Sequence, residues 1–263
     1  MDSDPDQLKS RLQAYLEATS GHRPKPGADI LDEFHRHVSQ EEMDRDGENF
    51  VKVIQDKHAG ETIIVLGTGP TLNDLDLSRF DRFTTLGCNG IGNLYHPDYY
   101  VILDPFIYGL HKDVFLSSPH TRILSSFTKG DFDLRIYYQY ENLVGLSKNE
   151  IFSADNTGFV LVSMAYIMGA KRIVLAGFDG YPPGSQQFHA YEEQPVEFDR
   201  AQYEWQDESG KAKGSLIQEA FEFARSKLIE EGREIRLLTP SYYLGDIIEP
   251  IGLQELEQGP ANR

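Results

Sequence analysis

From Glu61 onward, short runs of hydrophobic residues alternate with longer segments of mixed polarity. The clearest run is Ile63-Ile64-Val65-Leu66, which is typical of a parallel strand buried on both faces. Similar runs predict strands at Thr62–Leu66, Phe83–Gly87, Tyr99–Leu103, Thr121–Ser125, Arg172–Ala176 and Glu234–Leu238. Helical spacing of apolar residues is clearest at Gly158–Gly169 and Ser215–Glu231. This alternation predicts an α/β fold with a doubly wound, mostly parallel, Rossmann-like sheet.

The first 57 residues have a pattern of their own. Apolar residues at helical spacing predict two helices, one marked by Leu8, Leu12, Tyr15 and Leu16 and the other by Ile30, Leu31, Phe34 and Val38. We therefore expect an N-terminal helical extension over 1–57, which could serve interaction or dimerisation, ahead of a Rossmann-like nucleotide-binding catalytic domain over 58–250. Within that domain a polar and aromatic segment, about 181–214, predicts a small helical lid. Residues 251–263 are expected to be a flexible tail.

The chain of 263 residues has 42 acidic and 25 basic side chains, which gives a formal net charge of −17. Such a surface repels nucleic-acid phosphate, so no nucleic-acid partner is expected. The single cysteine, Cys88, excludes an internal disulfide and argues against a cysteine-rich metal site. The N-terminus is acidic and polar, and no apolar run approaches the ~20 residues that span a bilayer. These features predict a cytoplasmic protein.

One loop directly follows the strand at Thr62–Leu66 and consists of Gly67, Thr68, Gly69, Pro70 and Thr71. Its glycines permit unusual backbone angles and expose amide groups, so the loop can hold a nucleotide phosphate. The third glycine of the dinucleotide fingerprint and the Gly-Lys-Ser/Thr ending of the P-loop are both absent. On its own, the loop is equally well interpreted as a turn that closes the strand.

Two more strand ends carry a polar side chain. Asn89 follows the strand at Phe83–Gly87, where its amide could contact a base or sugar, or shape a turn. Asp104 follows the strand at Tyr99–Leu103, where it could bind a cation, hydroxyl or ammonium group, or cap a helix. In a doubly wound sheet, ligands bind beyond the carboxyl ends of the strands, which is where both residues fall.

The start of the helix at Gly158–Gly169 is a further candidate. Asn156, Thr157 and Gly158 open this helix. Asparagine and threonine are ordinary helix caps, but the free amides of a helix start also bind phosphate.

The last candidates follow the strand at Arg172–Ala176. Asp179, Tyr181 and His189 are expected to project into the same ligand crevice. His189 has the side chain of a general base near neutral pH. The alternative is a solvated loop histidine with no role in catalysis.

These clusters, in this order, resemble bacterial sialyltransferases of glycosyltransferase family 42 and relatives in domain-of-unknown-function family 115, over roughly residues 61–245. Gly67-Thr68-Gly69-Pro70-Thr71-Leu72 resembles the family's Gly-Asn-Gly-Pro-Ser-Leu loop around the cytidine nucleotide. Cys88-Asn89 is similar to a Cys-Asn that contacts the donor, and Asp104-Pro105 to an Asn-Pro beside it. Thr157-Gly158 resembles a Ser-Gly that touches the cytidine portion. Phe178-Asp179-Gly180-Tyr181 resembles Ile-Asp-Phe-Tyr, whose tyrosine approaches the donor phosphate.

The chain also departs from this pattern. The catalytic histidine of the sialyltransferases falls near Ser209-Gly210-Lys211, where this chain has no histidine. A second phosphate-contacting tyrosine falls near Gln187-Phe188 and is missing as well. Asp104 in place of asparagine puts a carboxylate near the donor phosphate, which favours a bridging cation or a different ligand.

The resemblance implies a glycosyltransferase with a CMP-nonulosonate (sialic-acid-like) donor and a glycan or glycoconjugate hydroxyl as acceptor. In an inverting displacement, His189 would be the base. Tyr181 and the backbone amides at Gly67–Gly69 and Thr157–Gly158 would stabilise the departing phosphate. No cofactor is required, although Mg²⁺ could assist through Asp104 or Asp179.

Two alternatives stay open. A Mg-dependent pyrophosphokinase acting on a 6-hydroxymethylpterin-like alcohol would use Asp104 and Asp179 to hold Mg²⁺ against ATP. No basic cluster suited to a triphosphate lies near these loops. The second alternative is a catalytically inactive nucleotide-binding scaffold that recruits a partner through its N-terminal helices, which agrees with the missing histidine and tyrosine.

Overall fold

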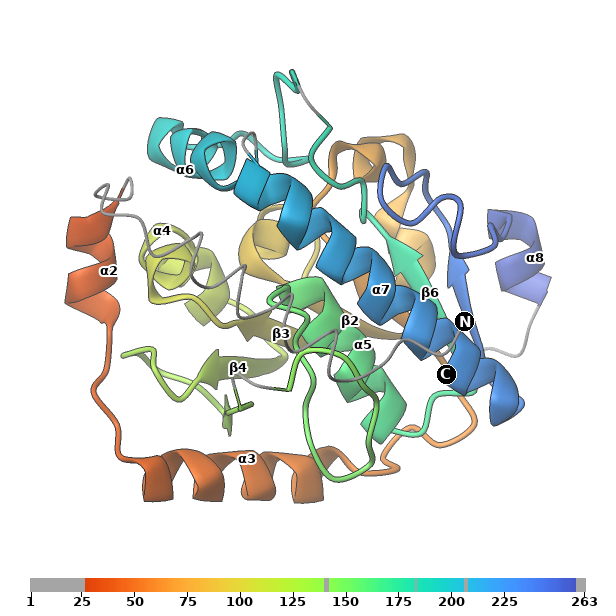
Figure 1. Ribbon diagram of the computed structural model, residues 1–263, viewed down its shortest axis with the longest axis horizontal. Coiled ribbons are helices and arrows are strands. Elements are labelled where there is room, and N and C mark those ends of the chain that lie inside the picture. The colour runs from red at the N-terminus through yellow and green to blue at the C-terminus, as the bar shows by residue number, and fades with distance from the viewer. Residues whose placement is uncertain (1–26, 140–141, 183, 206–207, 259–263) are drawn as a thin grey trace.

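In a computed structural model of the chain, residues 27–139, 142–182, 184–205 and 208–258 are described. They form a seven-stranded sheet with helices on both faces (Figure 1). The strands are β1 (Thr62–Leu66), β2 (Thr84–Cys88), β3 (Tyr99–Ile102), β4 (Thr121–Ser125), β5 (Leu134–Ile136), β6 (Arg172–Ala176) and β7 (Glu234–Leu237). Their order is β5-β4-β3-β2-β1-β6-β7, and every neighbouring pair is parallel. The prediction of a doubly wound, Rossmann-like α/β fold is confirmed.

β1 lies inside the sheet and is buried along its whole length. Ile63 and Val65 belong to one hydrophobic core, and Ile64 and Leu66 belong to the other. The first core is covered by α3 (Gln40–Ile54), α5 (Thr157–Ile167) and α7 (Glu208–Glu230), and the second by α4 (Pro105–Leu116). Because successive side chains of a strand point to opposite faces, an uninterrupted apolar run fits a sheet that is covered on both sides.

α5 is the most deeply buried helix of the described chain, with every residue from Gly158 to Ile167 buried. Asn156 caps its start, and Gly169 just beyond its end has φ +86°, a left-handed conformation that ends a helix readily. A helix that is apolar on all sides must be covered on all sides. β1, β2 and β6 cover it on one side, and α3 and α7 also pack against it (Figure 1).

The described part of the expected N-terminal extension packs against the sheet. α3 starts with a capping box between Ser39 and Glu42, and its Phe50, Val51 and Ile54 are buried in the first core. The expected boundary at residue 57 therefore does not separate α3 from the domain. The apolar face of α3 is thus used within the chain itself.

α2 (Ala28–Phe34) packs on α4 at Gly109. A Cβ added at Gly109 would lie 2.3 Å from Ile30, so the two helices approach closely because residue 109 has no side chain. α2 ends at Phe34, so Val38 lies beyond the helix in which it was expected. The other helix, expected over Leu8–Leu16, lies outside the described residues.

The end of the chain corrects another expectation. α8 (Leu253–Gln258) follows β7, and Ile251 and Leu256 are buried in the second core. Arg79 and Glu257 form an ion pair that ties this helix to the segment before β2. The flexible tail expected from residue 251 is therefore wrong up to residue 258, because its apolar residues complete the core.

Several element boundaries also differ from the sequence prediction. β5 and α4 were not predicted. α6 (Pro195–Trp205) lies in the segment expected to form a helical lid, 181–214. α7 begins at Glu208, earlier than the expected Ser215.

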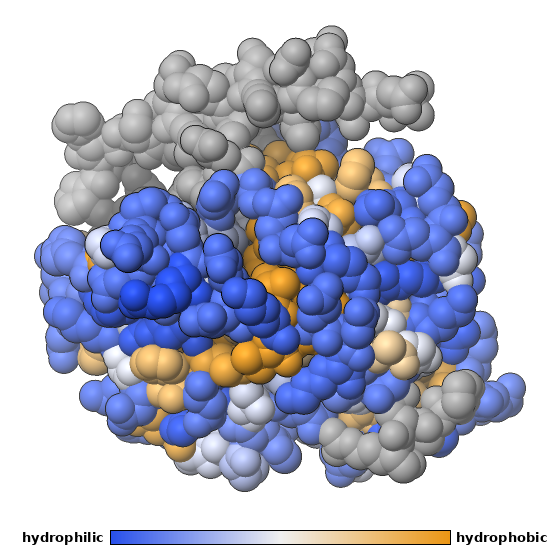
Figure 2. Space-filling model, turned by 90° about the horizontal axis from the view of Figure 1, so that it is seen from below, coloured by the Kyte–Doolittle hydropathy of each residue, from blue (hydrophilic) through white to orange (hydrophobic). Residues whose placement is uncertain are grey.

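The surface agrees with the composition. Figure 2 shows a mostly hydrophilic face that carries a band of hydrophobic residues across its middle. Within the described part of the chain, no helix combines the length and apolar character needed to cross a membrane.

Candidate functional site

β1 and β6 are parallel neighbours, and the order in which the chain adds strands to the sheet reverses between them. The chain runs from β1 toward β2 on one side and from β6 toward β7 on the other. Loops diverge at such a point, and in doubly wound sheets this is where nucleotides bind. The two loops here touch: the Gly67 amide donates to the Ala176 carbonyl and the Gly69 amide to the Gly177 carbonyl, both at 2.9 Å.

This contact corrects the role expected for two amides. Gly67 and Gly69 were expected to present their N–H groups to a phosphate, but each N–H already donates to the neighbouring loop. An N–H has one hydrogen, so neither amide binds a phosphate in this conformation. A Cβ added at Gly67 would lie 2.2 Å from the Gly177 carbonyl oxygen. The glycines therefore let the two loops approach each other.

Asp179 makes a second link between these loops. Its carboxylate accepts the Thr71 amide at 2.8 Å and the Thr71 hydroxyl at 2.5 Å. Burial raises the pKa of Asp179 above its ordinary 3.8, although the two hydrogen bonds from Thr71 act in the opposite direction. Asp179 was a candidate ligand for a metal or the donor, but both of its carboxylate oxygens accept hydrogen bonds from Thr71. It therefore has a structural role, which is to link the two loops.

The second predicted cluster opens the short 3₁₀ helix η3 (Asn89–Asn93) after β2. Asn89 has φ 55°, and its backbone carbonyl accepts the Tyr100 hydroxyl at 2.6 Å. The backbone conformation is therefore fixed, and the Asn89 side chain makes no hydrogen bond with any described residue. This side-chain amide is available to a ligand.

Asp104 acts as the helix cap that the sequence offered as its alternative role. Its side chain accepts the Phe106 amide at 2.8 Å at the start of α4, and Pro105 occupies the first position of that helix. The carboxylate is half-buried and already used in the protein. The structure thus provides a local reason for an aspartate at this position.

The start of α5 lies against the loop that follows β6. Asn156 caps the helix by accepting the Phe159 amide at 3.0 Å, and a Cβ added at Gly158 would lie 2.5 Å from the Phe178 ring. Lys213 from α7 forms an ion pair with Asp155 at 3.3 Å, which puts a cation beside the start of the helix. Thr157 is half-exposed there. The motif thus lies beside the loop that follows β6, and Lys213 is an addition that the sequence did not single out.

His189 is brought to the first two loops by its neighbours in the chain. The Ala190 amide donates to the Thr68 carbonyl at 2.8 Å, and the Tyr191 ring covers Gly90, where an added Cβ would lie 2.2 Å from the ring. His189 is 6% exposed. It is therefore a buried group beside the predicted nucleotide loops, and the solvated alternative is wrong.

Tyr181 takes a different position. It is half-buried, and its ring packs against Phe188 at 5.5 Å between ring centroids. Tyr181 begins the segment that carries His189, and it contacts Phe188, which directly precedes His189. The role expected for its hydroxyl at a phosphate stays a prediction.

A cluster of buried polar side chains surrounds His189, and sequence reasoning missed it. Glu197 accepts the Tyr191 hydroxyl at 2.6 Å and pairs with His111 from α4 at 3.1 Å. Glu193 lies 3.5 Å from His189. The one signal in the sequence was the regular spacing, since Glu193 and Glu197 follow His189 at intervals of four residues.

Both carboxylates of this cluster are held ionised. Burial acts to raise the pKa of Glu197, but His111, His189 and Tyr191 together hold it below the ordinary value of 4.5. Burial also opposes ionisation of Glu193, yet the nearby His189 ring and the hydrogen bonds from the Phe188 and His189 amides lower its pKa. Burial, and then the nearby Glu197, raise the pKa of Tyr191, so its hydroxyl remains a hydrogen-bond donor.

The metal role suggested for Asp104 and Asp179 finds no cluster to support it. Among the described residues, no group of three or more histidine, cysteine, aspartate or glutamate side chains is arranged to hold a metal ion.

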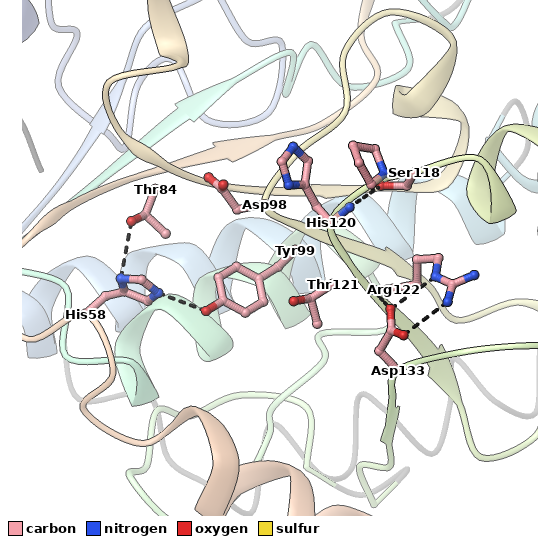
Figure 3. A pocket seen from close by; sticks show the side chains of 10 residues that line it. His58, Thr84, Asp98, Tyr99, Ser118, His120, Thr121, Arg122 and Asp133 are labelled. Carbon is pink, nitrogen blue, oxygen red and sulfur yellow. Dashed lines mark hydrogen bonds and ion pairs between the residues drawn. The ribbon is translucent and has the colours of Figure 1, made fainter. Parts of the chain in front are cut away.

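The opposite edge of the sheet carries a hollow of about 540 Å³ at the amino ends of β2, β3 and β4. Figure 3 shows the His58 ring between Thr84 and the Tyr99 hydroxyl, at 3.2 Å and 2.9 Å, and Arg122 facing Asp133. Arg122 and Asp133 form a bidentate pair at 3.0 and 3.1 Å. None of the candidate residues lines this hollow.

No family model and no curated protein matches the chain. Among solved structures, it is similar to the sialyltransferase CstII from Campylobacter jejuni in complex with cytidine-5'-monophosphate, at 15% identity and a TM-score of 0.43 over 73% of this chain and 85% of that one. A CstII complex with a trisaccharide acceptor and CMP gives 15% identity and 0.44 over 74% and 88%. The MAf glycosyltransferase from Magnetospirillum magneticum AMB-1 gives 14% and 0.44 over 80% of this chain and 36% of that one. The likeness to sialyltransferases expected from the motifs is thus found, as a likeness of fold.

Proposed function

We propose that this chain is a glycosyltransferase that takes a CMP-activated nonulosonate (sialic-acid-like) donor and transfers the sugar to a glycan hydroxyl with inversion. The observation that carries the proposal is the position of His189. The contacts of Ala190 with Thr68 and of Tyr191 with Gly90 hold a buried histidine beside the loops that follow β1 and β2. A general base must lie within reach of the ligand, and the position of His189 beside these loops supports that role.

In the proposed reaction, the acceptor oxygen attacks the anomeric carbon of the donor while His189 takes the hydroxyl proton. The bond between that carbon and the phosphate oxygen breaks, and CMP leaves with the electron pair. The groups proposed to hold the donor are the Asn89 side chain, the start of α5 at Thr157 and Gly158, and Tyr181. Positive charge near the phosphate would come from the helix start and from Lys213.

The test is a thermal-shift panel of CMP, CMP-sialic acid, UDP, GDP and ATP, each with and without Mg²⁺. A ligand at 100 times its Kd adds about 2.7 kcal/mol to the free energy of unfolding, which shifts Tm by several degrees. We expect this shift with cytidine ligands. Asn89→Ala should reduce it, and the exposed Asn149→Ala serves as the matched control.

Other outcomes would replace the proposal. A shift with ATP and Mg²⁺ alone would indicate the pyrophosphokinase. Binding of CMP-sialic acid without hydrolysis or transfer, over a panel of glycan acceptors, would indicate the inactive nucleotide-binding module. No shift with any cytidine ligand at millimolar concentration would overturn the nucleotide assignment itself.

A further inference from the structure

Three buried polar atoms in the cluster around His189 have no hydrogen-bond partner in the part of the chain that the structure describes: His189 Nδ1, Glu193 Oε2 and Glu197 Oε2. Nδ1 of His189 lies 3.5 Å from Glu193 Oε2 and 4.0 Å from Glu197 Oε1. The three side chains are 8, 7 and 3% exposed. A buried polar group without a partner costs about 1–3 kcal/mol, so this cluster calls for an explanation.

Glu193 is fixed to the backbone of the histidine that it faces. Its Oε1 accepts the Phe188 amide at 2.5 Å and the His189 amide at 2.7 Å. Oε1 is thus fully used, and the second oxygen of the same carboxylate is directed at the His189 ring. The Glu193 carboxylate thus contacts both the backbone amide and the ring of His189, which fixes the ring relative to the carboxylate.

Glu197 is committed elsewhere. Its Oε1 accepts the Tyr191 hydroxyl and the Nε2–H of His111. Asn93 donates its side-chain amide both to the Gly90 carbonyl at 2.8 Å and to Nδ1 of His111 at 3.2 Å, so Nδ1 of His111 is the acceptor. Glu197 therefore connects α6 to the second loop, and Glu193 is the carboxylate left for His189.

We propose that Glu193 is a positioning residue, which holds His189 as the tautomer with its proton on Nδ1 and leaves the lone pair of Nε2 for the acceptor hydroxyl. An ionised carboxylate only accepts hydrogen bonds, so the nitrogen that faces it must carry hydrogen. Nε2 hydrogen-bonds no residue in the described part of the chain. The distance of 3.5 Å is long for a hydrogen bond, and catalytic contacts of this kind tighten when substrate binds.

Tyr191 restrains the ring from a second side. Its ring stacks on that of His189 with 5.1 Å between centroids and an angle of 17° between planes. Its hydroxyl is anchored on Glu197. The imidazole plane is thereby restrained, so the tautomer decides whether Nε2 carries a hydrogen or an unshared electron pair. The role as a base rests on the proposed function, whereas the tautomer is a property of the protein alone.

The test is the tautomer of His189, measured by long-range ¹H–¹⁵N correlation at pH 8, where imidazole groups are ordinarily neutral. His189→Gln identifies the signals. We expect Nδ1–H in the wild-type protein. In Glu193→Gln, the amide oxygen keeps the two backbone hydrogen bonds and the NH₂ group replaces Oε2. The Gln side chain then donates to Nδ1, and the tautomer should invert to Nε2–H.

The neighbouring Glu192→Gln, which is exposed, carries the same change of charge and should leave the tautomer unchanged. Glu193→Asp retains a carboxylate and should keep Nδ1–H. Nε2–H in the wild-type protein would overturn the proposal, and so would an unchanged tautomer in folded Glu193→Gln. Should Glu193→Gln fail to fold, the wild-type spectrum still decides.

A kinetic measurement separates this proposal from the proposed function. With CMP-sialic acid as donor, Glu193→Gln should lower kcat at least ~100-fold with KM nearly unchanged, since a wrong tautomer removes the base. Absence of turnover in the wild-type protein would count against the glycosyltransferase and leave the tautomer result standing. If the tautomer inverts in Glu193→Gln and turnover is unchanged, neither Glu193 nor the Nε2 lone pair takes part in the mechanism.

Discussion

The polar side chains at the two ends of the parallel strands differ in how completely they are hydrogen-bonded. At the amino ends of the strands, the hollow beside His58 is open, and the polar side chains that line it pair with one another, as His58 does with Tyr99 and Arg122 with Asp133. At the carboxyl ends, His189 and Glu193 are buried and face each other without a hydrogen bond.

This difference distinguishes polar groups that stabilise the fold from polar groups that can act on a ligand. A buried polar group whose hydrogen bonds are all made contributes to folding, and nothing is left for a ligand. Buried groups that keep an unused donor or acceptor cost stability, and proteins retain them where they act on a ligand.

The largest expected effect comes from replacing one histidine at each end. His189→Ala should lower transfer from CMP-sialic acid by about 10²–10⁴-fold, because a general base is lost, while CMP still shifts Tm. His58→Ala should keep turnover within about twofold and lower the free energy of unfolding by about 1–3 kcal/mol, because Tyr99 and Glu61 lose their partner. Equal loss of activity in both variants would break the comparison.

The next effect tests how closely the two loops approach at the carboxyl edge. In Gly69→Ala, the added Cβ would lie 2.2 Å from Asp179, so one loop must shift, at a cost of about 1–3 kcal/mol. Urea unfolding should show this loss, and the Tm shift with CMP should shrink with it. Gly252→Ala is the matched control, since no atom lies within 4 Å of its added Cβ. Equal stability of the two variants would contradict the inferred contact.

The smallest effect is a dependence of stability on pH. The pKa values of Glu193 and Glu197 are lowered from 4.5 in the folded protein, so their ionised forms add stability that is fully present well above 4.5. As pH falls below that value, the unfolded chain binds protons first, and this contribution is lost through the lower folded pKa values. Urea unfolding at pH 7, 5 and 4 should show the fall in the wild-type protein.

The matching variants remove or keep those carboxylates. Glu193→Gln combined with Glu197→Gln should be less stable than the wild type at pH 7 and should lose less stability on acidification. Glu192→Gln combined with Glu255→Gln changes two exposed carboxylates and should follow the wild-type curve. An acid loss in the first double variant as steep as in the wild type would show that other groups control it.

Much of the sheet could be predicted because its strands are unbroken apolar runs. β1, β4 and β6 have the expected bounds, β3 and β7 end one residue earlier than expected, and β2 is shifted by one residue at both ends. β5 was not predicted because it is a strand of only three residues at the sheet edge and has Arg135 in its centre. Its place depends on pairing with β4, which no local pattern reveals.

The chemical roles were harder to predict because they depend on partners far along the chain. The Gly67–Thr71 loop was correctly placed after β1, but the Gly67 and Gly69 amides donate to Ala176 and Gly177, which are far away in the sequence. Asp179 was expected to bind the donor or a metal ion, but its carboxylate accepts a hydrogen bond from Thr71. His111 and Glu197 meet from α4 and α6, and neither helix position shows this pairing in the sequence.

The place of β1 inside the sheet has a consequence during synthesis. β1 pairs with β2 on one side soon after both are made, but its other neighbour, β6, begins only at Arg172. At ribosomal rates, the interval is on the order of ten seconds. For that time the segment Thr62–Leu66, which is apolar from Ile63 onward, has an open edge, and such an edge can pair with strands of other chains. The nascent chain is therefore most exposed to aggregation before its last third is translated.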